Sequence, residues 1–187
     1  GLWHTLGNLR VQGRHIRNIN TNGSYFGSDI YVKGNAYVLG RESFENRSSD
    51  IIVKGDLTIT APTVRNHKDV FKTGWTISEE DKYEGIPHLE QQNYYEADRR
   101  YHRIIHAGTI EEETSTSRML SDGTIHITGQ DVQNTYSQIM AKEGLQVTAD
   151  SVTNTGYQGT IHYDDIGRDR HYWKYKNSCF APPITRN

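Results

Sequence analysis

The sequence predicts an all-β fold in which short strands stack in parallel, and three features of the chain support this prediction. A ten-residue pattern recurs, with apolar residues at its first, third and eighth positions and asparagine at its tenth. Its opening alternation has the period of a strand and not of a helix, and its apolar residues mostly favour strands. Asn, Gly and Asp, which favour tight turns, separate the segments.

The pattern occurs in five copies, which are Leu9, Val11, Ile16 and Asn18; Tyr37, Leu39, Phe44 and Asn46; Leu57, Ile59, Val64 and Asn66; Ile125, Ile127, Val132 and Asn134; and Leu145, Val147, Val152 and Asn154. A unit this short cannot bury its own apolar face, so the copies must stack. A second short strand is predicted over 28–34, 49–55 and 137–142. Two or three strands per coil of about 20 residues predict a parallel β-helix, right-handed because parallel crossovers almost always are.

Length, composition and charge limit the classes of function. The 187 residues suit one domain or a section of a longer protein, and a hydrophobic fraction of 34% suits a narrow rod. A net charge of −2 without a basic stripe argues against a nucleic-acid partner, and no apolar stretch predicts a transmembrane segment. The single cysteine, Cys179, excludes an internal disulfide framework. Because the repeats start mid-pattern without caps or a signal peptide, we expect an excised segment.

The repeats divide the chain into four parts. Coils are predicted over residues 1–66 and 123–156, separated by an insertion over 67–122, because a step of 68 residues from 57 to 125 replaces the usual twenty. Insertions of this kind leave a solenoid at a turn and often form its binding face. Residues 157–187 form an aromatic and charged tail, which we interpret as either a second excursion or a lid over the last coil.

The insertion allows two interpretations of its secondary structure. Between residues 89 and 105, a helix would place Tyr94, Ala97, Tyr101 and Ile105 on one face. A strand would instead place Tyr95, Ala97, Tyr101 and Ile105 on one face. The following residues, Thr109 to Ser117, combine Glu with Ser and Thr, which makes a poor helix and a plausible exposed strand. We therefore favour a long antiparallel β-hairpin that stands outside the coils.

The asparagines that end the five copies are predicted to stack at one turn of successive coils. They are Asn18, Asn46, Asn66, Asn134 and Asn154. Asparagine tolerates the left-handed backbone expected at such a turn, and its amide can hydrogen-bond to the next asparagine along the stack. A sugar- or metal-binding row is the alternative, but we favour a structural ladder because turns commonly use Asn.

Histidines and carboxylates outside the coils suggest chemistry that we consider less well supported. His102 and His106 would suit zinc if they lay on a helix, and His162 and Asp164 keep that alternative open, but surface histidines explain the spacing better. Tail carboxylates at Asp164, Asp165 and Asp169 invite comparison with the acid–base pairs of polysaccharide-degrading enzymes. The coils carry no recurrent acidic pair, so we predict no enzyme activity, catalytic residue, metal or cofactor.

Aromatic residues in the insertion and tail are the candidate receptor-contact surface. With one arginine, they are Trp75, Tyr83, Tyr94, Tyr95, Arg99, Tyr101, Tyr172 and Trp173. Such side chains could protect open sheet edges from aggregation. They could equally be anchors for a partner, since Tyr, Trp and Arg supply most of the residues that dominate binding energy.

Several stretches resemble the filamentous-haemagglutinin repeats of two-partner-secreted exoproteins, and most of all the contact-dependent growth-inhibition effectors called CdiA proteins. The resemblance covers residues 6–156 and is carried by Ser121–Gly129, Val132-Gln133-Asn134, Ser137–Ala141 and Val147–Gly156. Tyr94–Tyr101 also resembles the extra-helical β-hairpin segments of that family. The chain departs from the family pattern at Lys142-Glu143-Gly144, where Ala-Gly-Gly is usual, and in a first coil eight residues longer than the next.

The resemblance implies a section of a filament on the surface of a Gram-negative bacterium, exported by an outer-membrane two-partner secretion transporter. It would serve as a stalk and as a candidate surface for a protein or glycan receptor on a neighbouring bacterial or host cell. In that family such contact precedes delivery of a C-terminal toxin, and nothing in this chain matches a toxin domain. The alternatives are a carbohydrate-active β-helix lyase or hydrolase and a spacer without a partner.

Overall fold

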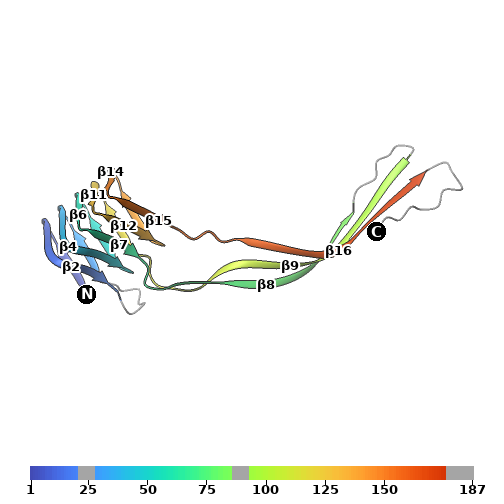
Figure 1. The fold of residues 1–187 in the computed structure, drawn as a ribbon, viewed down its shortest axis with the longest axis horizontal. Coiled ribbons are helices and arrows are strands. Elements are labelled where there is room, and N and C mark those ends of the chain that lie inside the picture. Colours follow the sequence, from blue (N-terminus) through green and yellow to red (C-terminus); the bar gives the residue numbers. More distant parts are fainter. Residues whose placement is uncertain (21–27, 86–92, 176–187) are drawn as a thin grey trace. The chain divides into compact units, whose positions relative to one another are not determined.

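The computed structural model describes residues 1–20, 28–85 and 93–175, with side chains in 1–20, 28–83 and 100–168. The regular elements among these residues are all β-strands (Figure 1). No helix in this part of the chain is long and apolar enough to cross a membrane. The chain divides into two compact units, one formed by Gly1–Thr73 and Ile110–Gln158 and the other by Gly74–Thr109 and Gly159–Asn187.

The first unit contains two parallel sheets, of which the smaller has five short strands. In spatial order these are β1 (Leu2–Thr5), β3 (Asp29–Val32), β5 (Asp50–Val53), β10 (Arg118–Ser121) and β13 (Gln138–Ala141). Neighbouring strands pair in parallel, so that Ile51 lies between Ile30 and Met119. Each strand of this sheet belongs to a different repeat of the chain.

The larger sheet has eight strands and curls. Its two long strands, β2 and β4, each extend through both of the strand stacks that shorter strands form in the later repeats. Its order is β14-β11-β6-β4-β7-β12-β15, with β2 also paired to β4. The strands are β2 (Leu9–Ile19), β4 (Ala36–Arg47), β6 (Leu57–Thr60), β7 (Thr63–His67), β11 (Thr124–Thr128), β12 (Asp131–Thr135), β14 (Gly144–Thr148) and β15 (Ser151–Thr155). The first part of β4 pairs with β6 and the last part with β7. The predicted all-β fold of parallel strands is therefore confirmed.

Apolar side chains from both sheets form one buried cluster. It contains Val32, Ala36, Val38, Phe44, Ile51, Val53, Leu57, Ile59, Ala61, Val64, Met119, Ile125, Ile127 and Val132. Leu57, Ile59 and Val64 of the third copy of the pattern are all in this core. Burying one such side chain contributes about 1.5–3 kcal/mol, so stacking supplies the apolar burial that a single repeat lacks.

In the second copy of the pattern, the predicted inward-facing residues are wrong by one position. Ala36 and Val38 of β4 lie beside the buried Leu57 and Ile59, whereas Tyr37 and Leu39 are 44% and 38% exposed. The pairing of β2 with β4 shifts between Gly13 and His15, so that β4 carries one residue more than β2 at this bend. Because of this extra residue, the usual spacing before Phe44 indicates the wrong face of β4, since a shift of one residue reverses every side chain of a strand.

Five asparagine side chains form a continuous ladder through the first unit. Each Nδ2 donates to the Oδ1 of the next asparagine: Asn18 to Asn46 at 2.8 Å, Asn46 to Asn66 at 2.9 Å, Asn66 to Asn134 at 2.8 Å and Asn134 to Asn154 at 2.8 Å. Asn46 and Asn66 are fully buried. Buried amides need partners for all their polar atoms, and the ladder supplies them in one direction along the stack.

Backbone carbonyl groups decide how the ladder amides are oriented. Besides its Asn partner, the Nδ2 group of Asn46 donates to the Ser49 carbonyl at 2.9 Å, and that of Asn134 donates to the Ser137 carbonyl at 3.0 Å. A carbonyl can only accept, so the NH₂ group must face it and Oδ1 must face the preceding asparagine. The ladder therefore has a donor end and an acceptor end.

The left-handed backbone expected at the asparagines is instead found two residues after Asn46 and two residues after Asn134. Among the described non-glycine residues, Ser48 and Tyr136 have positive φ angles of 49° and 51°, whereas the ladder asparagines lie within strands. Both residues hold the base of the insertion. Ser48 Oγ accepts from the Asp69 backbone N–H at 2.9 Å, and the Tyr136 ring stacks on Phe71 with centroids 4.0 Å apart.

Ser117 closes the first unit where the chain returns from the insertion. Its buried hydroxyl donates to the Asn46 carbonyl and lies 2.9 Å from Asn66 Oδ1 and 2.8 Å from Asn46 Nδ2. The next residue, Arg118, forms a paired hydrogen bond with Asp50 on β5 that raises the pKa of the guanidinium. Strand β10 thereby takes the place beside β5 that the uninterrupted repeat would occupy.

The second unit is built on a three-stranded sheet with the order β16-β9-β8. Its strands are β8 (Phe71–Gly85), β9 (Asn93–Glu113) and β16 (Ile161–Tyr175). Strands β9 and β16 are antiparallel from Ala107 opposite Ile161 to Asn93 opposite Tyr175. The segment for which a helix was the alternative is thus strand from Asn93 onward, and the predicted tail contributes a strand beside it.

Replacing a central asparagine of the ladder should destabilise the first unit strongly. In Asn66→Ala, the buried amide of Asn46 loses an acceptor and the side chain of Asn134 loses a donor. We expect the free energy of unfolding to fall by about 3 kcal/mol in urea denaturation followed by circular dichroism. The matched control is Asn154→Ala at the exposed end of the ladder, which should cost less than about 1 kcal/mol. Equal losses in the two variants would contradict the ladder's role.

Candidate recognition surface

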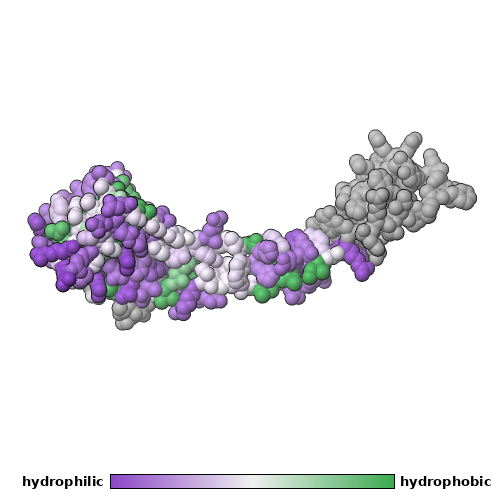
Figure 2. Space-filling model, in the orientation of Figure 1, coloured by the Kyte–Doolittle hydropathy of each residue, from purple (hydrophilic) through white to green (hydrophobic). Residues whose placement is uncertain are grey.

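The three-stranded sheet of the second unit exposes large apolar side chains. Trp75, Ile77 and Tyr83 on β8 and Ile161, Tyr163 and Ile166 on β16 are all at least half exposed. Figure 2 shows hydrophobic residues interspersed with hydrophilic ones on the visible face of these strands. Single exposed apolar residues are ordinary, but a group of them on one small sheet marks a candidate interaction surface.

The strand register separates the side chains of this sheet onto two faces. Alternate residues of a strand point to opposite faces, and His106 lies opposite His162 while Arg103 lies opposite Asp165. One face, here called the histidine face, carries His102, His106, His162, Asp164 and Ile166. The other, here called the arginine face, carries Tyr101, Arg103, Tyr163 and Asp165.

Arg103 organises the arginine face. Its Nε and one terminal nitrogen donate to the two carboxylate oxygens of Asp165 at 2.7 and 2.9 Å. Its guanidinium also lies 5.0 Å from the centre of the Tyr101 ring and 4.7 Å from that of Tyr163. The hydrogen bonds to Arg103 lower the pKa of the Asp165 carboxyl. A bidentate pair of this kind holds β16 in one register against β9.

The histidine face carries imidazole rings paired with carboxylates. Asp164 lies between two rings, 3.1 Å from His106 Nε2 and 3.0 Å from His162 Nε2. His102 Nδ1 lies 3.0 Å from Asp81, and its Nε2 lies 3.4 Å from Glu79. The hydrogen bond with Asp81 is the main cause of a raised pKa at His102. Within the described residues, no three metal-ligating side chains are placed to hold an ion.

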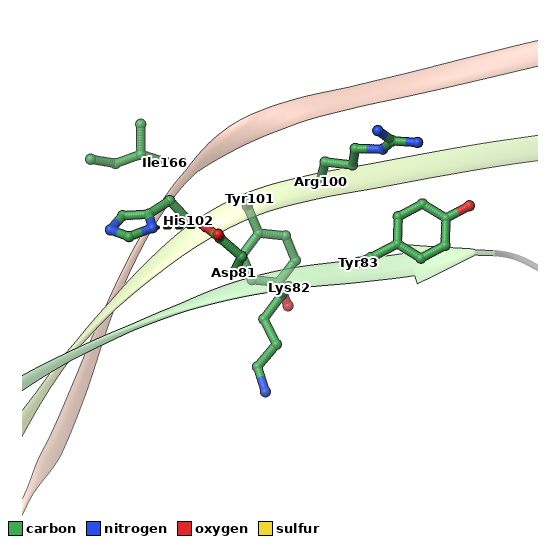
Figure 3. A pocket seen from close by; sticks show the side chains of 7 residues that line it. All are labelled: Asp81, Lys82, Tyr83, Arg100, Tyr101, His102 and Ile166. Carbon is green, nitrogen blue, oxygen red and sulfur yellow. Dashed lines mark hydrogen bonds and ion pairs between the residues drawn. The ribbon is translucent and has the colours of Figure 1, made fainter.

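A groove of about 610 Å³ lies on this sheet. It is lined by Asp81, Lys82, Tyr83, Arg100, Tyr101, His102 and Ile166. Figure 3 shows Asp81 and His102 directed toward one another, with Ile166 beside them on β16 and Arg100 near Tyr83. The Arg100 guanidinium lies 5.2 Å from the centre of the Tyr83 ring. Aromatic surface, a fixed cation and a carboxylate are thus presented together to solvent.

Gly167 allows β16 to approach β9 closely beneath the groove. It lies opposite Tyr101 in the antiparallel register. A Cβ atom at this position would lie only 2.3 Å from the Arg100 carbonyl oxygen and 2.3 Å from Tyr101 Cβ. Since real Cβ atoms do not come that close, any other residue here must push the two strands apart.

The structure describes only some of the predicted contact residues. Trp75 and Tyr83 are exposed on β8, and Tyr101 lies in the groove. The side chains of Tyr94, Tyr95, Arg99, Tyr172 and Trp173 fall outside the described residues, but the register pairs Trp173 with Tyr95. His88 and Cys179 also lie outside the described part of the chain.

Sequence reasoning missed the contributions of Arg100, Arg103 and Ile166 to this surface. Their importance depends on β16 lying beside β9, which the sequence did not indicate. The alternation of Ile161 and Tyr163 before Ile166 was the available signal for a strand in the tail. It would not have identified the partner strand.

The chain matches no protein-family model, no curated protein and no solved structure. The resemblance to haemagglutinin-type repeats therefore depends on the quoted sequence stretches alone.

The substitution Gly167→Ala should loosen the β9–β16 pairing locally. Because the added methyl group collides with the backbone of β9, we expect faster amide hydrogen exchange around residues 100–104 and 164–168. Ile166→Ala, which trims the exposed neighbouring side chain, is the matched control and should leave exchange nearly unchanged. If both variants exchange like the parent chain, the close approach at Gly167 is not needed.

The pKa of His102 should lie above the ordinary histidine value of 6.5 and depend on Asp81. Since pairing raises the pKa in the folded state, its contribution to stability is present below the unfolded pKa and is lost as the pH rises through the raised value. An NMR titration of the imidazole would test this. Asp81→Asn should lower the midpoint more than Glu79→Gln, and Glu80→Gln, whose carboxylate pairs with Lys82, should not change it.

Proposed function

We propose that this chain is a section of a secreted filament on the surface of a Gram-negative bacterium, exported by an outer-membrane two-partner secretion transporter. The first unit is a stretch of right-handed parallel β-helix that acts as a stalk. The three-stranded sheet of the second unit is the surface that contacts a receptor on a neighbouring bacterial or host cell. Delivery of a toxin carried elsewhere on the filament follows that contact.

Parallel stacking supports the role of the first unit as a stalk. Strands of different repeats hydrogen-bond to one another through the unit, and the asparagine ladder runs through the same stack. Hydrogen bonds between coils run along the stacking direction, so a pulling force loads many of them together. The result is a support that resists extension without needing disulfides.

The exposed aromatic and cationic side chains of the second unit support receptor recognition, and they are the observation on which this part depends most. Tyr83 is 64% exposed although it lies beside the guanidinium of Arg100. Tyr, Trp and Arg dominate the binding energy of protein interfaces, and tyrosine and tryptophan rings also stack on sugars. A protein or a glycan receptor would suit these side chains.

The carbohydrate-active enzyme is a weaker alternative. Asp164 and Asp165 are neighbours on β16 and point to opposite faces of the sheet, so they cannot flank one glycosidic bond. Each is also paired, Asp164 with two histidines and Asp165 with Arg103. The side chain of Asp169, the third carboxylate considered, lies outside the described residues. Incubation with acidic and neutral polysaccharides tests this alternative, and product release would favour the enzyme over the receptor-binding filament.

Binding of labelled chain to live Gram-negative cells tests the proposal. We expect saturable binding that weakens about tenfold or more in Tyr83→Ser, since loss of an aromatic residue that dominates an interface typically costs about 2 kcal/mol or more. The matched control is Tyr37→Ser, an exposed tyrosine on the first unit, which should bind like the parent chain. Equal binding by both variants would contradict a role for the groove. Absence of binding by folded chain would favour a spacer.

A further inference from the structure

The smaller sheet of the first unit carries an apolar row on its outward face. Along its strands, buried residues such as Ile51, Val53 and Met119 alternate with more accessible ones. The accessible positions are in register from strand to strand, so their side chains form one row across the sheet. From β1 to β13 this row, here called the outer row, consists of His4, Tyr31, Ile52, Leu120 and Met140.

Apolar residues are unusual on a sheet face that meets solvent. A sheet with one solvated face normally places polar residues on that face. The larger sheet follows this rule in β6, β11 and β14, whose outward residues include Thr58, Thr60, His126, Thr128, Gln146 and Thr148. None of the outer-row residues is buried, and Met140 is 59% exposed. A contiguous accessible row of this kind marks an interaction surface.

Further coils of a longer filament would not cover the outer row. They would add strands beside β1 or β13, along the direction in which the sheet already stacks. Ile52 and Leu120 lie on β5 and β10, which have paired strands on both sides, and their outward side chains are still partly accessible. A partner for the outer row therefore has to approach from the side of the stack.

Charged residues flank the outer row in a pattern that is complementary to itself. On three strands, residues of opposite charge lie two positions before and two positions after the outer-row residue. The pairs are Asp29 and Lys33 around β3, Asp50 and Lys54 around β5, and Arg118 and Asp122 around β10. Lys54 and Asp122 are 2.9 Å apart, yet their side chains remain 46% and 45% exposed. These charges are therefore available to a partner that covers the row.

We infer that the outward face of the smaller sheet packs against the same face of a second copy of this chain. The two-fold axis runs along the stacking direction, so each strand faces its own counterpart, which runs the opposite way. Leu120 then lies against Leu120 of the second copy. The charged pairs meet with opposite signs, since Lys33 faces Asp29 and Lys54 faces Asp50 of the second copy. Because both molecules use the same surface, the contact closes as a dimer.

Charge disfavours the dimer in which the two stacks run in opposite directions. A two-fold axis at right angles to the stack, between β5 and β10, would place β3 against β13 of the second copy. Lys33 would then face Lys142, and like charges that face one another weaken an interface. The two stacks therefore lie side by side and run in the same direction. This pairing does not depend on receptor binding by the second unit.

Two variants that place a charge in the outer row test the contact. Met140→Glu changes an exposed member and Leu120→Glu a central one, and circular dichroism with urea denaturation verifies that each folds. The matched control is Leu39→Glu, which places the same charge at an accessible apolar position on the larger sheet. In sedimentation equilibrium, we expect a reversible monomer–dimer equilibrium for the parent chain and the control. The dissociation constant should rise about tenfold or more in both outer-row variants.

Charge reversals on β3 test the orientation of the two copies. Asp29→Lys opposes a like charge at Lys33 of the second copy, and Lys33→Asp does so at Asp29. Each variant alone should therefore dimerise about tenfold or more weakly than the parent chain. An equimolar mixture of the two restores opposite charges at both contacts and should form heterodimers about as tightly as the parent chain forms homodimers.

Three results would overturn the inference. The first is a parent chain that stays monomeric at every concentration. The second is a Leu39→Glu variant that weakens the dimer as much as the outer-row variants do. The third is a mixture of the two β3 variants that associates no more tightly than either variant alone. Tighter dimerisation of Lys33→Asp would show that the stacks run in opposite directions and would overturn the proposed orientation.

Discussion

The asparagine ladder is the constraint on which the rest of the first unit depends. A buried amide must satisfy two donors and an acceptor, and Asn46 and Asn66 do so only when repeats lie directly above and below them. Apolar stacking alone would tolerate a shift of one coil along another, because many apolar side chains are interchangeable. The ladder does not tolerate it, so it sets the register in which all the parallel strands pair.

The chain leaves the first unit from corresponding positions of its repeats. The chain leaves the first unit shortly after Asn66 and again shortly after Asn154, which are members of one ladder. Segments that are far apart in sequence therefore leave the stack at corresponding positions of different repeats. Within the second unit, β16 pairs with β9. Where the chain returns from the insertion, the Ser117 hydroxyl donates to the Asn46 carbonyl and to Asn66 Oδ1. The stack of strands is thus continuous although the insertion interrupts the sequence of repeats.

Predictability differed between the two units for physical reasons. The repeat pattern predicted parallel stacking correctly because alternation and periodic asparagines are local properties of the chain. It failed at Tyr37 and Leu39, where one extra residue at a bend of β4 reverses the faces. It also placed the left-handed backbone at the asparagines, whereas Ser48 and Tyr136 adopt it. Both errors concern bends, where residue spacing alone does not determine which residue is inserted or which adopts a positive φ angle.

By itself the sequence determined the class of fold, the direction of stacking and the five asparagines that share one position. Each repeat contains the same alternation of apolar residues and the same terminal asparagine, which are local properties of the chain. Only the tertiary structure decided that the tail lies beside the insertion, with Arg103 paired to Asp165 and Gly167 against Tyr101. Those contacts join segments that have no common pattern. Antiparallel pairing between unlike strands depends on side-chain fit in three dimensions, which no periodicity in the chain encodes.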